Sequence, residues 1–194
     1  MPPKAEITKE MIIRAAFELT RVQGLEVVTA RNIAKKINCS TQPIYSLFEN
    51  MDEIKSETYQ QALDFQRKQV SEYKSDHNSS ALDLAIGMLC FAKTEKHLFR
   101  TIYLSGLKTY SPLEEKFIGE AIAMEYLRQS SRLKRIDEAK LREIVLNLTI
   151  YLIGLGTMIN TKTLDLDIEE ATEMVRKMYD GLLLSESTER NKGE

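Results

Sequence analysis

Hydrogen-bonding side chains crowd one short stretch near the N-terminus, CSTQPIYSLFEN at residues 39–50. Hydroxyl and amide groups can donate hydrogen bonds to phosphate oxygens and base edges, and can accept them from base amino groups. Pro43 lies among them, and proline is tolerated in the first turn of a helix because the N–H groups of that turn lack intrahelical partners. The stretch therefore predicts a short helix whose polar N-terminal end can approach the bases of a DNA groove. Its polar residues are Ser40, Thr41, Gln42 and Ser46.

No part of the chain offers a set of residues suited to catalysis. The sequence has no nucleophile motif, no metal-ligand cluster and no glycine-rich phosphate loop. His77 has no partner at metal-ligand spacing, and the acidic run at 165–170 lacks the glycine and terminal glutamate of a calcium loop. The two cysteines, Cys39 and Cys90, make neither a disulfide framework nor a metal knuckle. We therefore expect a protein that is not an enzyme and uses no cofactor or metal.

Two helices are predicted ahead of the polar stretch. Apolar residues recur at helical spacing over 8–23, with Thr8 as a plausible N-cap and Gly24 just past the end. Thr29 can cap a second helix over 30–37. These two helices form the support against which the polar stretch can pack.

The third helix is predicted to begin at Ser40 as its N-cap, which places Pro43 in the first turn. Ile44 and Phe48 then form its apolar back. Only residues 38–40 connect it to the second helix, and short helices joined so tightly are typical of a helix-turn-helix, whose last helix enters the major groove. The hydroxyls of Tyr45 and Thr29, and the N–H groups at the starts of these helices, can contact phosphates.

The rest of the chain is predicted to be helical too, because the whole sequence contains only 4 prolines and 8 glycines and no alternating strand pattern occurs. Asn50 with Glu53 three residues later forms a capping signature for a long fourth helix over 51–75, followed by a polar connection. The fold expected is all-α, with about nine helices. Those that remain are expected near 80–92, 95–105, 112–133, 138–161 and 168–184, the last after an Asp167–Glu170 capping box.

Charge and hydropathy limit the partners. The net charge is −2, but residues 1–51 carry seven Lys and Arg against five Glu, so the N-terminal part is slightly basic and can take an anionic partner. The N-terminus has no apolar run of a secretory signal, so we expect a soluble, cytoplasmic protein. Residues 144–159 are almost all apolar, but these 16 residues are fewer than the roughly 20 that span a bilayer, so a buried helix and no membrane partner are expected.

A specific combination of residues runs through 12–54: Ile12, Ala15-Ala16, Glu18-Leu19, Gly24, Thr29, Arg31, Ile33-Ala34, Ser40, Ile44-Tyr45, Phe48, Asn50 and Ile54. This pattern, about a quarter of the chain, resembles the tetracycline-repressor (TetR) family of one-component transcription factors. Two positions depart from the family pattern. Met51 stands where a phosphate-contacting Lys is common, and Asn38 stands where the turn commonly has glycine, although asparagine tolerates a left-handed conformation better than most residues.

The resemblance implies roles for the residues at matching positions. Arg31 corresponds to a base or phosphate contact, and Tyr45 to a phosphate-contacting tyrosine. It also implies a DNA-binding head at 1–50 and a helical ligand-binding and dimerisation body at 51–185. The sequence itself predicts a disordered tail at 186–194. The base-reading positions are Thr41, Gln42, Pro43 and Ser46.

An inducer pocket in the body is implied by the resemblance alone. Ordinary packing is the alternative for each residue that could line it, and His97 with Arg100, about one helical turn apart, could meet an anionic ligand or face water. The candidates are Phe65, Met88, Phe91, His97, Phe99, Arg100, Tyr103, Tyr126, Asn147 and Tyr151.

A dimer interface is predicted from the two C-terminal helices. Glycines in the first allow close approach of another helix, the second has an apolar face, and two such helices from each protomer would form a four-helix interface, as the resemblance also implies. The alternative is that both helices pack only within one chain. The interface residues expected are Tyr151, Gly154, Met158, Met174, Met178 and Leu182.

The sequence as a whole thus predicts a transcriptional regulator, a ligand-released repressor that binds a palindromic operator in double-stranded DNA as a homodimer and responds to an unidentified small-molecule inducer. The other possibility is a helical protein-interaction adaptor that does not bind DNA.

Overall fold

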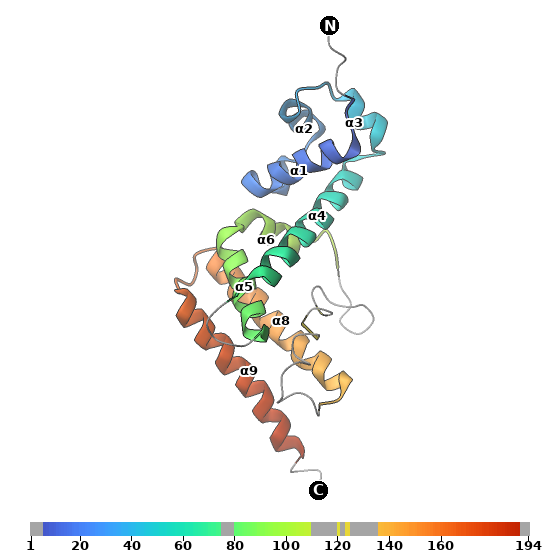
Figure 1. The fold of residues 1–194 in the computed structure, drawn as a ribbon. Helices are drawn as coiled ribbons and strands as arrows, with labels where there is room; N and C mark the ends of the chain where they lie inside the picture. Colours follow the sequence, from blue (N-terminus) through green and yellow to red (C-terminus); the bar gives the residue numbers. More distant parts are fainter. Residues whose placement is uncertain (1–5, 75–79, 110–119, 121–122, 125–135, 191–194) are drawn as a thin grey trace. The chain divides into compact units, whose positions relative to one another are not determined.

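The computed structural model describes residues 6–74, 80–109, 120, 123–124 and 136–190, and most of these residues are helical (Figure 1). No strand occurs in these residues, so the prediction of an all-α fold is confirmed for them. Eight α-helices and one short 3-10 helix are present in the described part. They are α1 (Lys9–Gln23), the 3-10 helix η1 (Leu25–Val27), α2 (Ala30–Lys36), α3 (Gln42–Leu47), α4 (Met51–Glu72), α5 (Ser80–Thr94), α6 (Lys96–Tyr103), α8 (Glu138–Asn160) and α9 (Ile168–Arg190).

Side chains cap the first two helices where the sequence predicted. The hydroxyl of Thr8 accepts a hydrogen bond from the backbone N–H of Met11 at 3.3 Å, and that of Thr29 accepts one from Asn32 at 3.2 Å. Each bond satisfies an N–H group that has no partner within its helix. α1 ends at Gly24, whose φ of +99° is a conformation that a residue with a Cβ rarely adopts. The chain thereby leaves α1 directly into η1, which sequence analysis did not predict.

The predicted cap of the third helix is wrong by one residue. Thr41, not Ser40, occupies the N-cap position of α3, because its carbonyl accepts the first helical bonds, from the N–H groups of Ile44 at 3.2 Å and Tyr45 at 3.3 Å. The backbone of Thr41 is already helical, at φ −75° and ψ −14°, and its side chain makes no capping hydrogen bond. Pro43 lies in the first turn, as expected.

The later helices follow the predicted order with shifted ends. The capping box before α9 is formed in both directions, since Glu170 N–H donates to Asp167 Oδ1 at 2.8 Å and Asp167 N–H to Glu170 Oε2 at 3.0 Å. α4 ends at Glu72, short of the predicted residue 75. α9 continues through residues 186–190, which the sequence had assigned to a disordered tail, because no glycine or proline interrupts that charged segment. Most of the helix expected over 112–133 lies outside the described residues.

The chain divides into two compact units. The first comprises Met1–Gln66 and Glu95–Lys108, and the second comprises Arg67–Thr94 and Thr109–Glu194. The head expected at 1–50 is therefore part of a larger unit, which also contains α6 and most of α4. In the second unit α5, α8 and α9 pack together. There the buried amide of Asn160 donates to the carbonyl of Ala92 at 2.9 Å and joins the end of α8 to α5.

Candidate nucleic-acid interface

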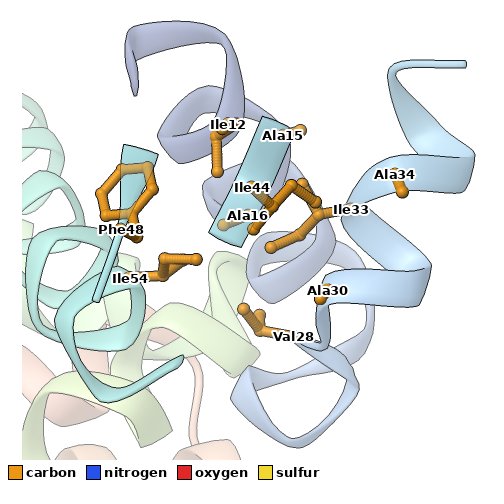
Figure 2. Close-up of a cluster of buried hydrophobic side chains, with 10 residues drawn as sticks. All are labelled: Ile12, Ala15, Ala16, Val28, Ala30, Ile33, Ala34, Ile44, Phe48 and Ile54. Carbon is orange, nitrogen blue, oxygen red and sulfur yellow. The ribbon is translucent and has the colours of Figure 1, made fainter. Parts of the chain in front are cut away.

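A buried apolar cluster holds α3 against α1, α2 and the start of α4 (Figure 2). Ile44 on α3 is completely buried, and Phe48, just after α3, is almost so. Burial of side chains of this size stabilises a fold by about 2 kcal/mol each, so the apolar back of α3 is firmly anchored. The ten buried residues of the cluster are Ile12, Ala15, Ala16, Val28, Ala30, Ile33, Ala34, Ile44, Phe48 and Ile54.

The turn between α2 and α3 is closed by an asparagine in a left-handed conformation. Asn38 has a φ of +55°, and its N–H donates to the carbonyl of Lys35 at 3.4 Å, while the N–H of Cys39 donates to that of Ala34 at 2.9 Å. These two bonds form a Schellman motif, which satisfies carbonyls at the end of α2. Asparagine adopts a positive φ more readily than other residues with a side chain, which explains how the turn forms without glycine.

The side of α3 away from the cluster is polar and open to solvent. Tyr45 is 61% exposed, and Thr41, Gln42 and Ser46 are exposed as well. The hydroxyl of Ser46 donates to the carbonyl of Gln42 at 3.0 Å, so its proton is held by the helix itself and its lone pairs face outward. The exposed groups of α3 can thus make and accept hydrogen bonds, as readout of base edges requires.

The remaining predicted DNA contacts lie at the starts of α2 and α3. Thr29 caps α2, Arg31 is exposed in its first turn, and Ser40 is exposed just before α3. Pro43 is half-buried, whereas the other seven of the eight predicted contacts are exposed.

Several basic residues of α1 and α2 are paired with glutamates. Glu18 on α1 accepts from Lys36 at 2.9 Å and lies 3.4 Å from Arg14, and the bond from Lys36 lowers the pKa of Glu18. Arg31 and Lys35, both exposed on α2, form no ion pair with any residue in the described part of the chain. These two cations are therefore available to phosphates.

The predicted pocket residues do not all lie in one unit. Phe65, His97, Phe99, Arg100 and Tyr103 belong to the first unit, and Met88, Phe91, Asn147 and Tyr151 belong to the second. Tyr126 lies outside the described residues. Met88, Phe91 and Phe99 are buried, Phe65, His97, Tyr103 and Tyr151 are half-buried, and Arg100 and Asn147 are exposed.

The predicted interface residues differ in exposure. Gly154 and Met158 are exposed on α8 and Tyr151 is half-buried. Apart from the backbone of its own helix and its chain neighbours, no heavy atom lies within 4 Å of the position that a Cβ on Gly154 would take. On α9, Met174, Met178 and Leu182 are half-buried. Leu182 packs against a core cluster of its own chain that includes Leu141 and Ile144.

Sequence reasoning missed the contacts that join distant segments of the first unit. Arg21 at the end of α1 donates to Glu95 before α6, with a distance of 2.8 Å between Nε and Oε2. Lys9 at the start of α1 donates to Glu53 on α4 at 3.2 Å. These pairs are separated by 74 and 44 residues, so no local spacing indicates them, and only the charge of each residue could have suggested a partner.

The described residues were also searched for metal sites and for helices that could span a membrane. No group of three or more His, Cys, Asp or Glu in the described part of the chain could hold a metal ion. Among the helices that were searched, α8 is the one long and apolar enough to cross a membrane, with a mean hydropathy of 1.4 in its most apolar window. A core helix of a soluble protein passes the same test, and α8 packs against α5 and α9.

Comparisons with known proteins identify the fold. No protein-family model matches the sequence, and no curated protein matches it significantly. Among solved structures, the chain is similar to that of the Streptomyces coelicolor TetR family protein ActR in complex with (S)-DNPA. The TM-score is 0.60 at 14% sequence identity, and the match covers 94% of this chain and 100% of the other. The fold is therefore that of a TetR family protein.

Proposed function

We propose that this chain, which has the TetR fold, is a DNA-binding transcriptional regulator, and that the surface formed by α3 and the start of α2 is its DNA-binding site. The observation that carries the proposal is the two-sided character of α3. Ile44 and Phe48 fix its back in the core, while Gln42 and Tyr45 are exposed to solvent, as is the unpaired Arg31 in the first turn of α2. In a helix-turn-helix the last helix needs a firm attachment and an uncovered polar face, because the major groove must receive it.

The test is selection of bound duplexes from a random DNA pool at moderate salt. We expect enrichment of a defined sequence, and loss of that binding in Gln42→Ala and Tyr45→Ala. Gln69→Ala is the matched control, because Gln69 is an exposed glutamine of α4 in the other unit and should bind DNA as the unchanged protein does. A folded protein that enriches no sequence at any salt concentration would contradict the proposal and favour a helical protein-interaction adaptor. In that case Tyr45 would be an anchor for a protein partner.

A homodimer is the second part of the proposal, and an exposed, mostly apolar stripe on α8 supports it. Asn147, Ile150, Gly154 and Met158 follow one another at helical spacing and are exposed, Ile150 at 57% and Met158 at 41%. Glycine in an exposed helix costs about 1 kcal/mol relative to alanine, which suits a position where another helix approaches closely. Two-fold pairing through this stripe would match a palindromic operator with half-sites separated by whole turns of the duplex.

Sedimentation velocity tests the dimer. We expect the unchanged protein to sediment as a dimer and Ile150→Glu as a monomer, because the substitution places a charge in the middle of the stripe. Lys93→Glu, which introduces a glutamate on an exposed part of α5, should remain dimeric. A monomeric wild-type protein at micromolar concentration would contradict this part of the proposal without affecting DNA binding by a single head.

Release by a small molecule is the third part. The ActR structure contains (S)-DNPA, which supports a ligand-binding body in the same fold. α4 runs from the DNA-binding unit into the second unit, and it is tied to α6 by a 2.5 Å bond from the Gln66 amide to the Tyr103 hydroxyl. A ligand that binds better to one arrangement of these helices would shift the protein away from the DNA-bound arrangement. Compounds that dissociate the selected duplex identify such a ligand, and a library of metabolites without effect would count against release.

A further inference from the structure

Glu53, in the first turn of α4, bonds to two other segments at once. Its Oε2 accepts a hydrogen bond from the backbone N–H of Glu49 at 2.7 Å, and its Oε1 lies 3.2 Å from Nζ of Lys9 at the start of α1. The same ammonium group lies 4.6 Å from the centroid of the Phe48 ring. One carboxylate therefore joins the start of α1, the end of the α3 segment and the start of α4.

The bond to Glu49 departs from an ordinary capping box. In that motif the third helical residue bonds back to the N–H of the N-cap residue, which here is Asn50. Asn50 caps the helix in the usual way, since its Oδ1 accepts hydrogen bonds from the N–H groups of Asp52 and Glu53, both at 2.9 Å. Glu53, however, reaches one residue further back, to Glu49. It thereby holds the residue that directly follows Phe48, rather than only the first turn of its own helix.

This connection reaches α3 through a short rigid path. Phe48 is buried in the core cluster, and its N–H donates to the carbonyl of Ile44 at 3.0 Å. Glu49 is covalently next to it and is fixed by Glu53. The N–H of Glu49 lowers the pKa of Glu53, with a smaller effect from Lys9, so this carboxylate is ionised at neutral pH and both contacts are charge-assisted.

We propose that Glu53, with Lys9, is a positioning residue for DNA binding: it sets the angle between α3 and α4, so that the polar face of α3 is presented to the groove. The inference rests on the proposed function. At the start of α4 the resembling family commonly has a lysine that contacts phosphate. Here that position is Met51, which packs against the core cluster, so we assign the start of α4 a positioning role in place of a phosphate contact.

If the carboxylate of Glu53 acts only through its charge, its removal should raise the affinity for DNA. If it positions α3, its removal should lower the affinity for the selected duplex. A negative charge near the DNA-binding surface repels phosphates, so its removal by itself would tighten binding to any DNA. If Glu53 positions α3, Glu53→Ala must instead weaken binding to the selected duplex, by about tenfold for the loss of a charge-assisted hydrogen bond. Its binding to a random duplex should be unchanged or tighter.

Glu57→Ala is the matched control. Glu57 is an exposed glutamate one turn further along α4, so the substitution removes the same charge from the same helix without the contacts to Glu49 and Lys9. We expect it to leave the affinity for the selected duplex unchanged or slightly increased. Glu53→Gln keeps an oxygen that can accept from Glu49 N–H and should recover most of the affinity lost in Glu53→Ala. Equal or tighter specific binding by Glu53→Ala would overturn the inference.

A measurement without DNA separates this inference from the proposed function. Amide hydrogen exchange on the full chain should be faster at Glu49 and over α3 in Glu53→Ala, and unchanged there in Glu57→Ala. If the wild-type protein selects no duplex, the proposed function fails and the role in DNA binding fails with it, whatever the exchange rates. If the wild type binds selectively and exchange over α3 is the same in both variants, the positioning role alone is overturned.

Discussion

Arg21 and Glu95 form a two-pronged ion pair that joins the last turn of α1 to the residue before α6. Nε of Arg21 lies 2.8 Å from one carboxylate oxygen, and Nη2 lies 2.5 Å from the other. The guanidinium also lies 4.8 Å from the centroid of the Phe65 ring on α4. Three helices of the first unit therefore meet at one cation. α1 also packs against α3 through the core cluster, so this pair connects the residue before α6 to the helix that supports α3.

Arg21→Ala should lower the free energy of unfolding by about 1–2 kcal/mol, because the Glu95 carboxylate, only 11% exposed, loses two charge-assisted hydrogen bonds while Arg21 itself is 45% exposed and partly screened. Chemical denaturation measures the loss. Arg176→Ala, which removes an exposed pair with Glu173 on α9, is the control and should change the free energy by less than about 0.5 kcal/mol. Equal effects of the two substitutions would show that the Arg21 pair has no special role.

The turn at Asn38 gives a second prediction, because its φ of +55° disfavours residues with a Cβ other than asparagine. Asn38→Ala should destabilise the fold by about 1 kcal/mol, whereas Asn38→Gly should be close to neutral or stabilising. Thermal unfolding of the two variants measures the order. An alanine variant as stable as the glycine variant would contradict the left-handed turn.

Acid should weaken the attachment of α2 to α1. The bond from Lys36 holds the pKa of Glu18 below its usual value, which is about 4.3 for a solvated glutamate. A group with a lowered folded-state pKa contributes stability that is complete above the unfolded pKa and is lost as the pH falls through the folded pKa. The stability difference between the wild type and Glu18→Gln should therefore be present at pH 7 and shrink below about pH 4. Urea unfolding at a series of pH values measures this, and a difference that persists unchanged at pH 3 would contradict it.

The dependence of DNA affinity on salt concentration shows how many cations contact phosphates. Several basic side chains of α1 and α2 are paired with glutamates, so we expect a shallow dependence of DNA affinity on salt, to which Arg31 is a main contributor. Arg31→Ala should reduce the slope of log K against log salt by about 1 per protomer. Lys177→Ala, on α9, should leave the slope unchanged. If Arg31→Ala lowers affinity equally at all salt concentrations, Arg31 contacts no phosphate.

Local patterns predicted the parts of this protein that local interactions decide. The caps at Thr8, Thr29 and Asp167 need only a side-chain oxygen and an N–H three residues away, so the sequence was sufficient to locate them. The left-handed turn at Asn38 was indicated by the family resemblance, because asparagine stands where the turn commonly has glycine. Where the local evidence was balanced, at Ser40 and Thr41, the prediction chose the wrong neighbour, because both residues have hydroxyls and the helix geometry distinguishes them.

The predicted site residues also differ in whether local spacing was enough to find them. The exposed polar face and buried back of α3 were predictable, because helical spacing alone separates Gln42 and Tyr45 from Ile44 and Phe48. The pocket residues were chosen by residue type over a long stretch of chain, and the structure distributes them between two units and leaves Asn147 exposed. Aromatic and polar types occur in cores, at surfaces and in pockets alike, so type without spacing has little power to locate a site.

The sequence by itself determined most of the described helices, the caps at Thr8, Thr29 and Asp167, and the amphipathic character of α3, since these depend on residues within one or two turns of each other. Only the tertiary structure decided that Lys9 pairs with Glu53 and Arg21 with Glu95, and that α6 belongs to the unit that contains α3. The physical reason is that every exposed lysine or arginine has many glutamates within reach in the unfolded chain. The burial of the apolar cluster around Ile44 fixes the positions of the helices around it, and that packing selects which opposite charges meet.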